Sequence, residues 1–188
     1  AGKKMLSDEN LGDSILGGLV GWHDGRLHYT AGVNLYMPTG HYDEGEAVNT
    51  GRNYWAIEPN AAFTYLNESN GLEFSSALGL TINRENDYTD YRTGNELHLE
   101  LAAIQHLSKY VYVGVAGYVY DQLTGDSGSG ARLGDFEGKV NGVGPVIGGM
   151  LPFGDGQMLV FNARYYTESD AENRMEGDAL WLSATVSF

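Results

Sequence analysis

The sequence predicts an all-β protein, an antiparallel transmembrane β-barrel of the outer-membrane type. Three observations lead to this prediction. Segments of about ten residues alternate between apolar and small or polar side chains, their connections alternate between short turns and long acidic loops, and aromatic residues gather near the segment ends. Strands that cross an outer membrane need about 9–11 residues and alternate in this way. We expect one barrel domain over residues 1–188, with nine strands.

The clearest alternation lies at the end of the chain, in a strand predicted to end on Phe188. Leu180, Leu182, Val186 and Phe188 share one face, whereas Trp181 and several Ser and Thr residues share the other. Successive side chains of a strand point to opposite faces, so this strand has one apolar and one mixed face. We expect the barrel-assembly machinery to bind this strand.

Eight further segments predict strands. In most of them Leu, Val, Ile or Phe recurs at every second position, opposite Gly, Ala, Thr, Tyr or a charged residue. Two of the segments, 14–22 and 140–151, are apolar and rich in Gly on both faces, so their sidedness is not predicted. The eight segments are 14–22, 27–37, 54–65, 72–82, 96–104, 110–120, 140–151 and 158–166.

The connections predict which end of the barrel faces the periplasm. Short turns are expected at 23–26, 67–70, 108–109 and 152–156, and long polar loops at 38–53, 83–94, 121–139 and 167–178. Short periplasmic turns and longer extracellular loops are typical of outer-membrane barrels. The acidic loops either bind divalent cations near lipopolysaccharide or form a solvated surface.

A soluble barrel such as a lipocalin is the alternative, with the apolar faces turned inward around a ligand. Periodicity alone cannot distinguish the two. The apolar faces contain no charged residue, which favours lipid contact. Aromatic residues near the strand ends suggest an interfacial girdle; these are Trp22, Tyr54, Trp55, Tyr65, Tyr110, Tyr165 and Trp181.

Composition argues against several functions. The net charge of −14 disfavours a nucleic-acid partner, whose phosphates require Lys and Arg. The chain has no Cys, and no nucleophile–base motif indicates an enzyme. His98 and Glu100 lie two residues apart on one strand face, but two ligands do not make a metal site. We therefore expect no enzyme activity, no cofactor and no metal.

The strand number is odd, whereas bacterial single-chain barrels have an even number. An open sheet edge in lipid would leave backbone groups unpaired, at a cost of several kcal/mol or so for each group. We therefore expect that an odd number of N-terminal strands lies outside this chain.

Two segments carry a resemblance to a known family. They are residues 90–100 (DYRTGNELHLE) and 113–122 (VGVAGYVYDQ). Four short motifs support them in order: Gly12-Asp13, Pro38-Thr39-Gly40, Glu58-Pro59 and residues 142–145 (GVGP). Together these segments resemble the outer-membrane channel family of the meta-pathway of phenol degradation. The resemblance covers nearly the whole chain. It implies a bacterial outer-membrane barrel of about twelve strands, of which this chain holds the last nine, and uptake of small hydrophobic compounds.

If the apolar faces meet lipid, the opposite faces line a lumen. We expect Arg164 to pair across the lumen with Glu58 or Glu100, and Tyr112, Tyr118 and Tyr120 to form an aromatic stripe. Both features suit a sparsely charged channel for passive uptake of small hydrophobic, aromatic-type solutes; they also suit a filled structural or adhesive barrel. The predicted lumen residues are Glu58, Asn60, His98, Glu100, Tyr112, Tyr118, Tyr120, Asn162, Arg164 and Tyr166.

Overall fold

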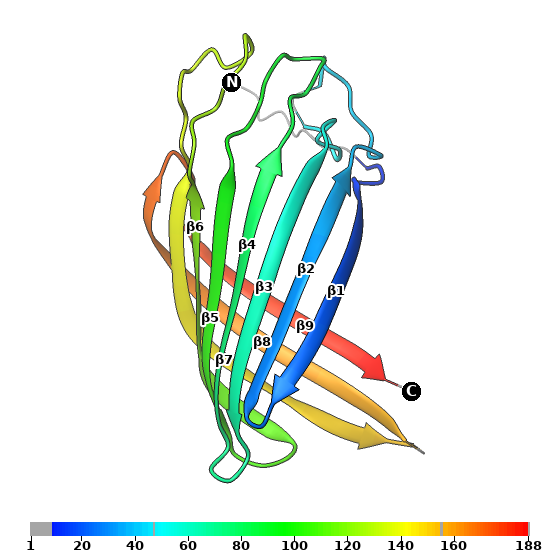
Figure 1. Ribbon diagram of the computed structural model, residues 1–188, viewed down its shortest axis with the longest axis vertical. Helices are drawn as coiled ribbons and strands as arrows, with labels where there is room; N and C mark the ends of the chain where they lie inside the picture. Colours follow the sequence, from blue (N-terminus) through cyan, green and yellow to red (C-terminus); the bar gives the residue numbers. More distant parts are fainter. Residues whose placement is uncertain (1–8, 47, 155, 188) are drawn as a thin grey trace, which may run out of the picture.

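A computed structural model describes residues 9–46, 48–154 and 156–187 and consists of one curled sheet of nine antiparallel strands (Figure 1). Each strand pairs with the next along the chain, so the order is β1 to β9. The strands are β1 (Ser14–Asp24), β2 (Leu27–Met37), β3 (Ala56–Asn67), β4 (Leu72–Asn83), β5 (Glu96–His106), β6 (Val111–Gln122), β7 (Lys139–Phe153), β8 (Gln157–Glu172) and β9 (Asp178–Ser187).

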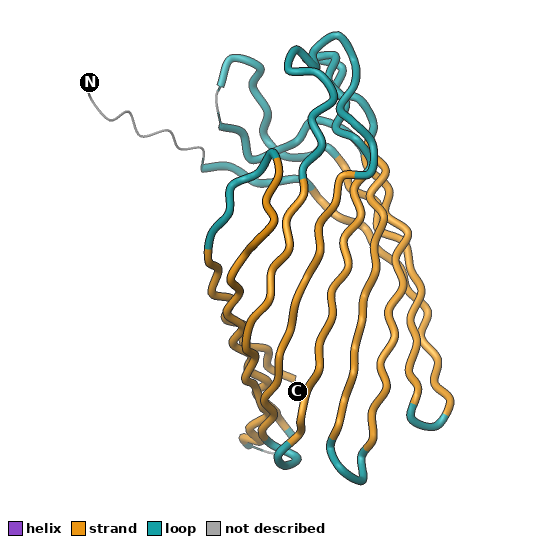
Figure 2. The backbone as a smooth tube through the Cα atoms, turned by 90° about the vertical axis from the view of Figure 1, so that its left-hand side faces the viewer, coloured by secondary structure: helices purple, strands orange, loops and turns teal. Residues whose placement is uncertain are grey.

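The nine predicted strands are confirmed, most of them within two residues at each end. The short turns gather at one end of the sheet and the long loops at the other (Figure 2). The positive φ angles of Gly25 and Gly71 fit the tight turns after β1 and β3. Phe188, the predicted end of the last strand, lies outside the described residues.

The sheet has a concave and a convex face. Side chains of strands two or three apart in the order meet on the concave face: Glu58 of β3 contacts His98 of β5, and Arg164 of β8 contacts Glu100 of β5. Such contacts require strong curvature, because neighbouring strands are about 4.8 Å apart. The predicted lumen residues lie on this concave face.

The predicted apolar faces lie on the convex side and are exposed. Leu101 is 50% exposed, Val115 54%, Val143 56% and Leu182 72%. The opposite face, by contrast, buries Glu58, Thr81 and Ala116 to 6% exposure or less. The sidedness that periodicity left open is therefore apolar outside and mixed inside.

Aromatic residues of the convex face stack at the turn end of the first three strands. Trp22 and Tyr29 stack with their ring centroids 5.7 Å apart, and Tyr29 lies 5.6 Å from Phe63. Of these three residues, only Trp22 belongs to the predicted girdle. The prediction was wrong for Trp181, which pairs in register with Arg164 and lines a cavity on the concave side.

The structure corrects the bounds of one predicted loop. Residues 167–178 were expected to form a long external loop, but β8 continues to Glu172 and only 173–177 connect it to β9. The polar composition of 167–172 resembles a loop, yet these residues pair with β7 across a register shift between Lys139 and Asn141. Asp170 has a φ of 54° at this irregularity, a conformation that Asp tolerates better than most residues.

The sheet is not closed in the part of the chain that the structure describes, because β1 pairs only with β2 and β9 only with β8. None of the described residues belongs to a helix long and apolar enough to cross a membrane.

Candidate functional site

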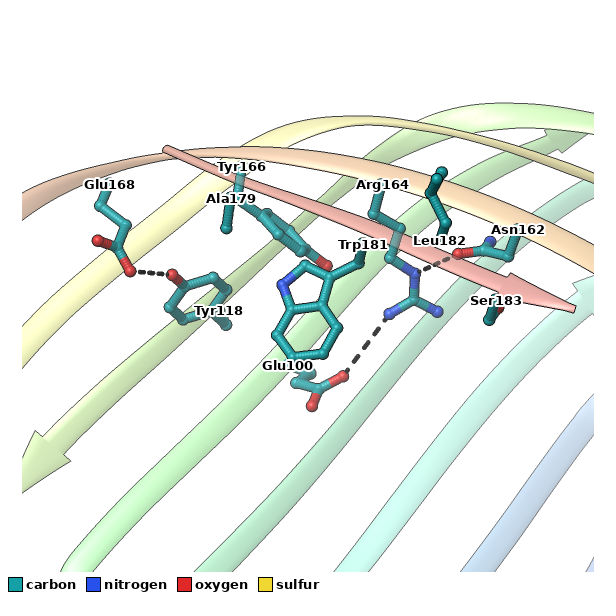
Figure 3. Close-up of a pocket in the computed structure, with 10 residues that line it drawn as sticks. All are labelled: Glu100, Tyr118, Asn162, Arg164, Tyr166, Glu168, Ala179, Trp181, Leu182 and Ser183. Carbon is teal, nitrogen blue, oxygen red and sulfur yellow. Dashed lines mark hydrogen bonds and ion pairs between the residues drawn. The ribbon is translucent and has the colours of Figure 1, made fainter. Parts of the chain in front are cut away.

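A cavity of about 580 Å³ lies on the concave face, between β5, β6, β8 and β9 (Figure 3). It is lined by charged groups from two strands and by aromatic rings from three. Five of the ten predicted lumen residues meet here: Glu100, Tyr118, Asn162, Arg164 and Tyr166. Glu168, Ala179, Trp181, Leu182 and Ser183 complete the lining.

Arg164 is the cation of this cavity. Its Nε donates to Oδ1 of Asn162 at 3.0 Å, and its Nη1 lies 4.0 Å from Oε2 of Glu100. The predicted pairing of Arg164 with an acidic residue is thus confirmed for Glu100. Both side chains are substantially exposed, 42% and 61%, so the pair is open to solvent and to solutes.

Aromatic rings form the other wall of the cavity. Tyr118 and Tyr166 pack edge to face with centroids 5.1 Å apart. The Tyr118 hydroxyl donates to Glu168 at 2.5 Å, which holds the ring in place. The Trp181 indole lies between these rings and the Arg164 guanidinium (Figure 3). The cavity thus combines an aromatic surface with the charged and polar side chains of Glu100, Asn162, Arg164 and Glu168.

Glycines of neighbouring strands give the rings room along the wall. Tyr118 faces Gly142 in register, Tyr112 faces Gly148, and His98 faces Gly79. A Cβ at Gly142 would lie 2.4 Å from the Tyr118 ring, and one at Gly148 only 2.3 Å from the Tyr112 hydroxyl. The rings therefore lie along the wall over these glycines, and the interior stays open.

A second polar cluster surrounds Glu58 nearer the loop end. Its carboxylate accepts from Tyr36 at 2.8 Å, Asn34 at 3.0 Å and Thr81 at 3.1 Å, and lies 3.2 Å from Nε2 of His98. The alternative pairing of Arg164 with Glu58 was wrong, because four donors nearby already satisfy this carboxylate. Asn60 lies beside the cluster and donates to the Glu58 backbone oxygen.

A third cluster, near the turn end, was not predicted from the sequence. Nε2 of His106 lies 2.7 Å from Oε2 of Glu73, and the His106 ring packs 5.5 Å from Tyr112. Tyr112 in turn accepts from Asn162 at 2.9 Å. His106 has the same parity as His98 and Glu100 on β5, and that signal could have placed it in the lumen.

A small apolar cluster lies beside the cavity and this lower cluster. Ile104, Ala116, Val146 and Tyr166 bury one another at 7% exposure or less. The concave face therefore carries polar groups along its length, with one apolar cluster among them. It carries more acidic groups than predicted, because Glu73, Glu96 and Glu168 join the lumen set, but each of them bonds to a His or Tyr side chain.

At the loop end, Tyr120 donates to Glu96 at 2.5 Å, and the Arg174 guanidinium lies 4.1 Å above the Tyr120 ring. All ten predicted residues thus lie on the concave face, in four groups. No three His, Asp or Glu side chains of the described residues converge in a way that could hold a metal ion. His98 turns toward Glu58 and away from Glu100.

The loops above the site are tied together by buried polar groups. Asp126, only 5% exposed, accepts from the Tyr91 hydroxyl, from Gln122 at 2.7 Å and from the Gly94 backbone at 3.1 Å. Burial and the nearby Asp126 carboxylate raise the pKa of Tyr91 above its ordinary value. The loops 84–95 and 123–138 are therefore one ordered unit at the mouth.

Comparison with known proteins gives one match. No curated protein and no solved structure matches the chain significantly. One family profile, described as "Putative MetA-pathway of phenol degradation", matches residues 4–184. This match covers nearly the whole chain and agrees with the resemblance of residues 90–100 and 113–122, so the chain belongs to the phenol-degradation MetA-pathway family.

Proposed function

We propose that the protein is a bacterial outer-membrane channel for passive uptake of small hydrophobic, aromatic-type molecules. The observation that carries the proposal is the aromatic cavity formed by Tyr118, Tyr166 and Trp181 on the inner face of a sheet whose outer face is apolar. Membership of a phenol-degradation family supports the same class of solute. The proposed channel has no catalytic step and needs no cofactor.

The sidedness of the sheet supports a membrane location. A soluble barrel turns its apolar residues inward, whereas here Leu101, Val115, Val143 and Leu182 are half or more exposed on the outside. Burial in lipid would be favourable for such a surface, at about 25 cal/mol per Å². In lipid, the free edges of β1 and β9 need partners, so the proposal requires further strands that close the barrel.

The interior supports a path for weakly polar solutes. Tyr and Trp rings offer apolar area with one polar tip, which suits an aromatic solute that carries at most a hydroxyl. Interior carboxylates have a basic side chain as partner at three levels: Glu58 with His98, Glu100 with Arg164, and Glu73 with His106. A purely structural barrel would be expected to fill the space that the 580 Å³ cavity leaves open.

A liposome experiment tests the proposal. The full chain is reconstituted, and the entry of toluene or phenol is compared with that of a disaccharide. The expected result is faster entry of the aromatic solute and no change in sugar entry over protein-free liposomes. Fast unselective sugar entry would indicate a general porin, and no flux of either solute would favour a structural barrel.

A further inference from the structure

A second cavity of about 580 Å³ lies on the outer surface, where β2, β3 and β4 meet the loop end of the sheet. It does not belong to the aromatic cavity inside. Its floor is apolar, and its upper wall carries two arginines. The lining includes Leu35, Trp55, Ile57, Ile82, Arg84 and Arg92.

The floor is a row of outward side chains. Leu35 pairs in register with Ile57, and Ile57 pairs with Ile82, so the three lie side by side across the strands. Ile57 is 45% exposed and Ile82 37%. A row of exposed branched side chains on an outer barrel surface is suited to contact with acyl chains.

The upper wall begins directly beyond this row. The Arg84 backbone donates to the Trp55 carbonyl at 2.9 Å, which places Trp55 and Arg84 opposite each other, two residues beyond Ile57 and Ile82. Alternate residues share a face, so Arg84 continues the outward row. Arg92 is held beside it by a bond from its Nε to the Asn83 carbonyl at 3.0 Å. Trp55 thus lies at the junction between the apolar floor and the two charges, where interfacial Trp is common.

The two guanidinium groups lack acidic partners. In the part of the chain that the structure describes, no carboxylate lies within 4.0 Å of either group, whereas Arg164 and Lys139 each have one. Glu85 also lines the cavity, but its Oε2 lies 3.4 Å from the position of a Cβ on Gly128, toward the 123–138 loop. The cavity therefore brings together two arginines without an acidic partner, in a chain of net charge −14 with 11 basic residues.

We propose that this cavity binds a phosphate-bearing lipid of the outer leaflet, with its acyl chains along Leu35, Ile57 and Ile82 and a phosphate between Arg84 and Arg92. Guanidinium groups bind phosphate through paired N–H donors, and charge complementarity selects an anion at this position. The site differs from the solute path in location and in ligand. It rests on the proposed function only in requiring that the sheet spans the outer membrane.

The test uses the full chain in neutral-lipid nanodiscs and measures retention of a bisphosphorylated acyl glycolipid (lipid A) by native mass spectrometry. The expected result is specific retention that falls about tenfold or more in Arg84→Gln/Arg92→Gln, since charge-assisted bonds are the strong ones. Arg26→Gln/Lys109→Gln removes the same charge at the turn end and is expected to leave retention unchanged. Arg84→Gln alone removes a side chain that forms no hydrogen bond or ion pair with the described residues, so it is expected to show a smaller loss with the loops intact.

Three results would overturn the lipid site: equal retention of the dephosphorylated glycolipid, an equal loss in the turn-end control, or inorganic phosphate competing as well as the lipid, which would indicate a simple anion site. Failure of the protein to enter nanodiscs would contradict both the site and the channel. A protein that enters nanodiscs and passes aromatic solutes, but retains the glycolipid equally with and without its phosphates, would contradict the lipid site alone.

Discussion

His98 of β5 reaches Glu58 of β3 at 3.2 Å across the intervening strand β4, because Gly79 of β4 has no side chain in the way. A Cβ at Gly79 would lie 2.3 Å from the imidazole ring. The same relationship recurs where Tyr118 lies over Gly142 and Tyr112 over Gly148. At three places along the concave face, a ring therefore lies over a glycine of the neighbouring strand.

Gly79→Ala is expected to lower the free energy of unfolding by about 1–3 kcal/mol, the usual cost of overpacking. The new methyl group displaces His98 and takes one partner from the buried Glu58 carboxylate. The measurement is urea unfolding of the reconstituted protein. Gly18→Ala is the matched control, because a Cβ there meets nothing within 4 Å. Equal stability of the two variants would contradict the role of Gly79.

Gly142→Ala is expected to slow aromatic flux more than it lowers stability. The added Cβ would lie 2.4 Å from the Tyr118 ring, so the ring must swing into the cavity and leave Glu168. Liposome flux of toluene provides the measurement. Adding Tyr118→Ala to Gly142→Ala removes the obstructing ring and should restore flux. Flux that stays low in the double variant would show that the ring is not the obstruction.

The sequence predicted the strands well, since periodicity depends only on the exposure of each face. For the same reason, the ten predicted residues share one face of the sheet, the concave one. The sequence left open whether Arg164 pairs with Glu58 or Glu100, and it did not predict the contact of Glu58 with His98, because strand curvature and register decide which side chains meet across the concave face. His106 was missed because it lies at the last position of β5, where alternation gives the weakest signal.

The extension of β8 was missed for a different reason. Residues 167–172 are polar, and polarity was read as a loop, but Glu168 faces the interior and accepts from Tyr118. The loop end of β8 lines a polar part of the concave face, so its residues need not be apolar. Trp181 was misplaced because a ring near a strand end fits an interfacial girdle and a lumen equally well until the register with Arg164 is known.

Arg164→Gln is expected to change stability by less than about 1 kcal/mol, since the ion pair with Glu100 is solvent-exposed. It should, however, make the interior more negative and shift ion selectivity toward cations. Reversal potentials in planar bilayers measure this shift. Arg164→Gln/Glu100→Gln restores the charge balance and should reverse it. Unchanged selectivity and unchanged stability together would rule out any role for the pair.

The folded protein is expected to lose stability at alkaline pH because of Tyr91. Burial and Asp126 raise its pKa in the folded state, so the unfolded chain loses this proton first as pH rises above about 10. The stabilisation is therefore present at neutral pH and is lost as pH rises toward the folded-state pKa. Tyr91→Phe, which cannot ionise, should be less stable at pH 7 but show a shallower alkaline decline. If the free energy of unfolding fell equally with pH in both proteins, Tyr91 would not be the cause of the alkaline loss.

The central claim is uptake of small aromatic molecules through the cavity that Tyr118, Tyr166 and Trp181 line. The most direct measurement is the initial rate of labelled toluene uptake by bacterial cells with the protein, without it, and with Tyr166→Ala/Trp181→Ala, at equal amounts in the outer membrane. We predict faster uptake with the protein, a reduced rate with the double variant and no change in disaccharide uptake. Equal toluene uptake with and without the protein would contradict the account.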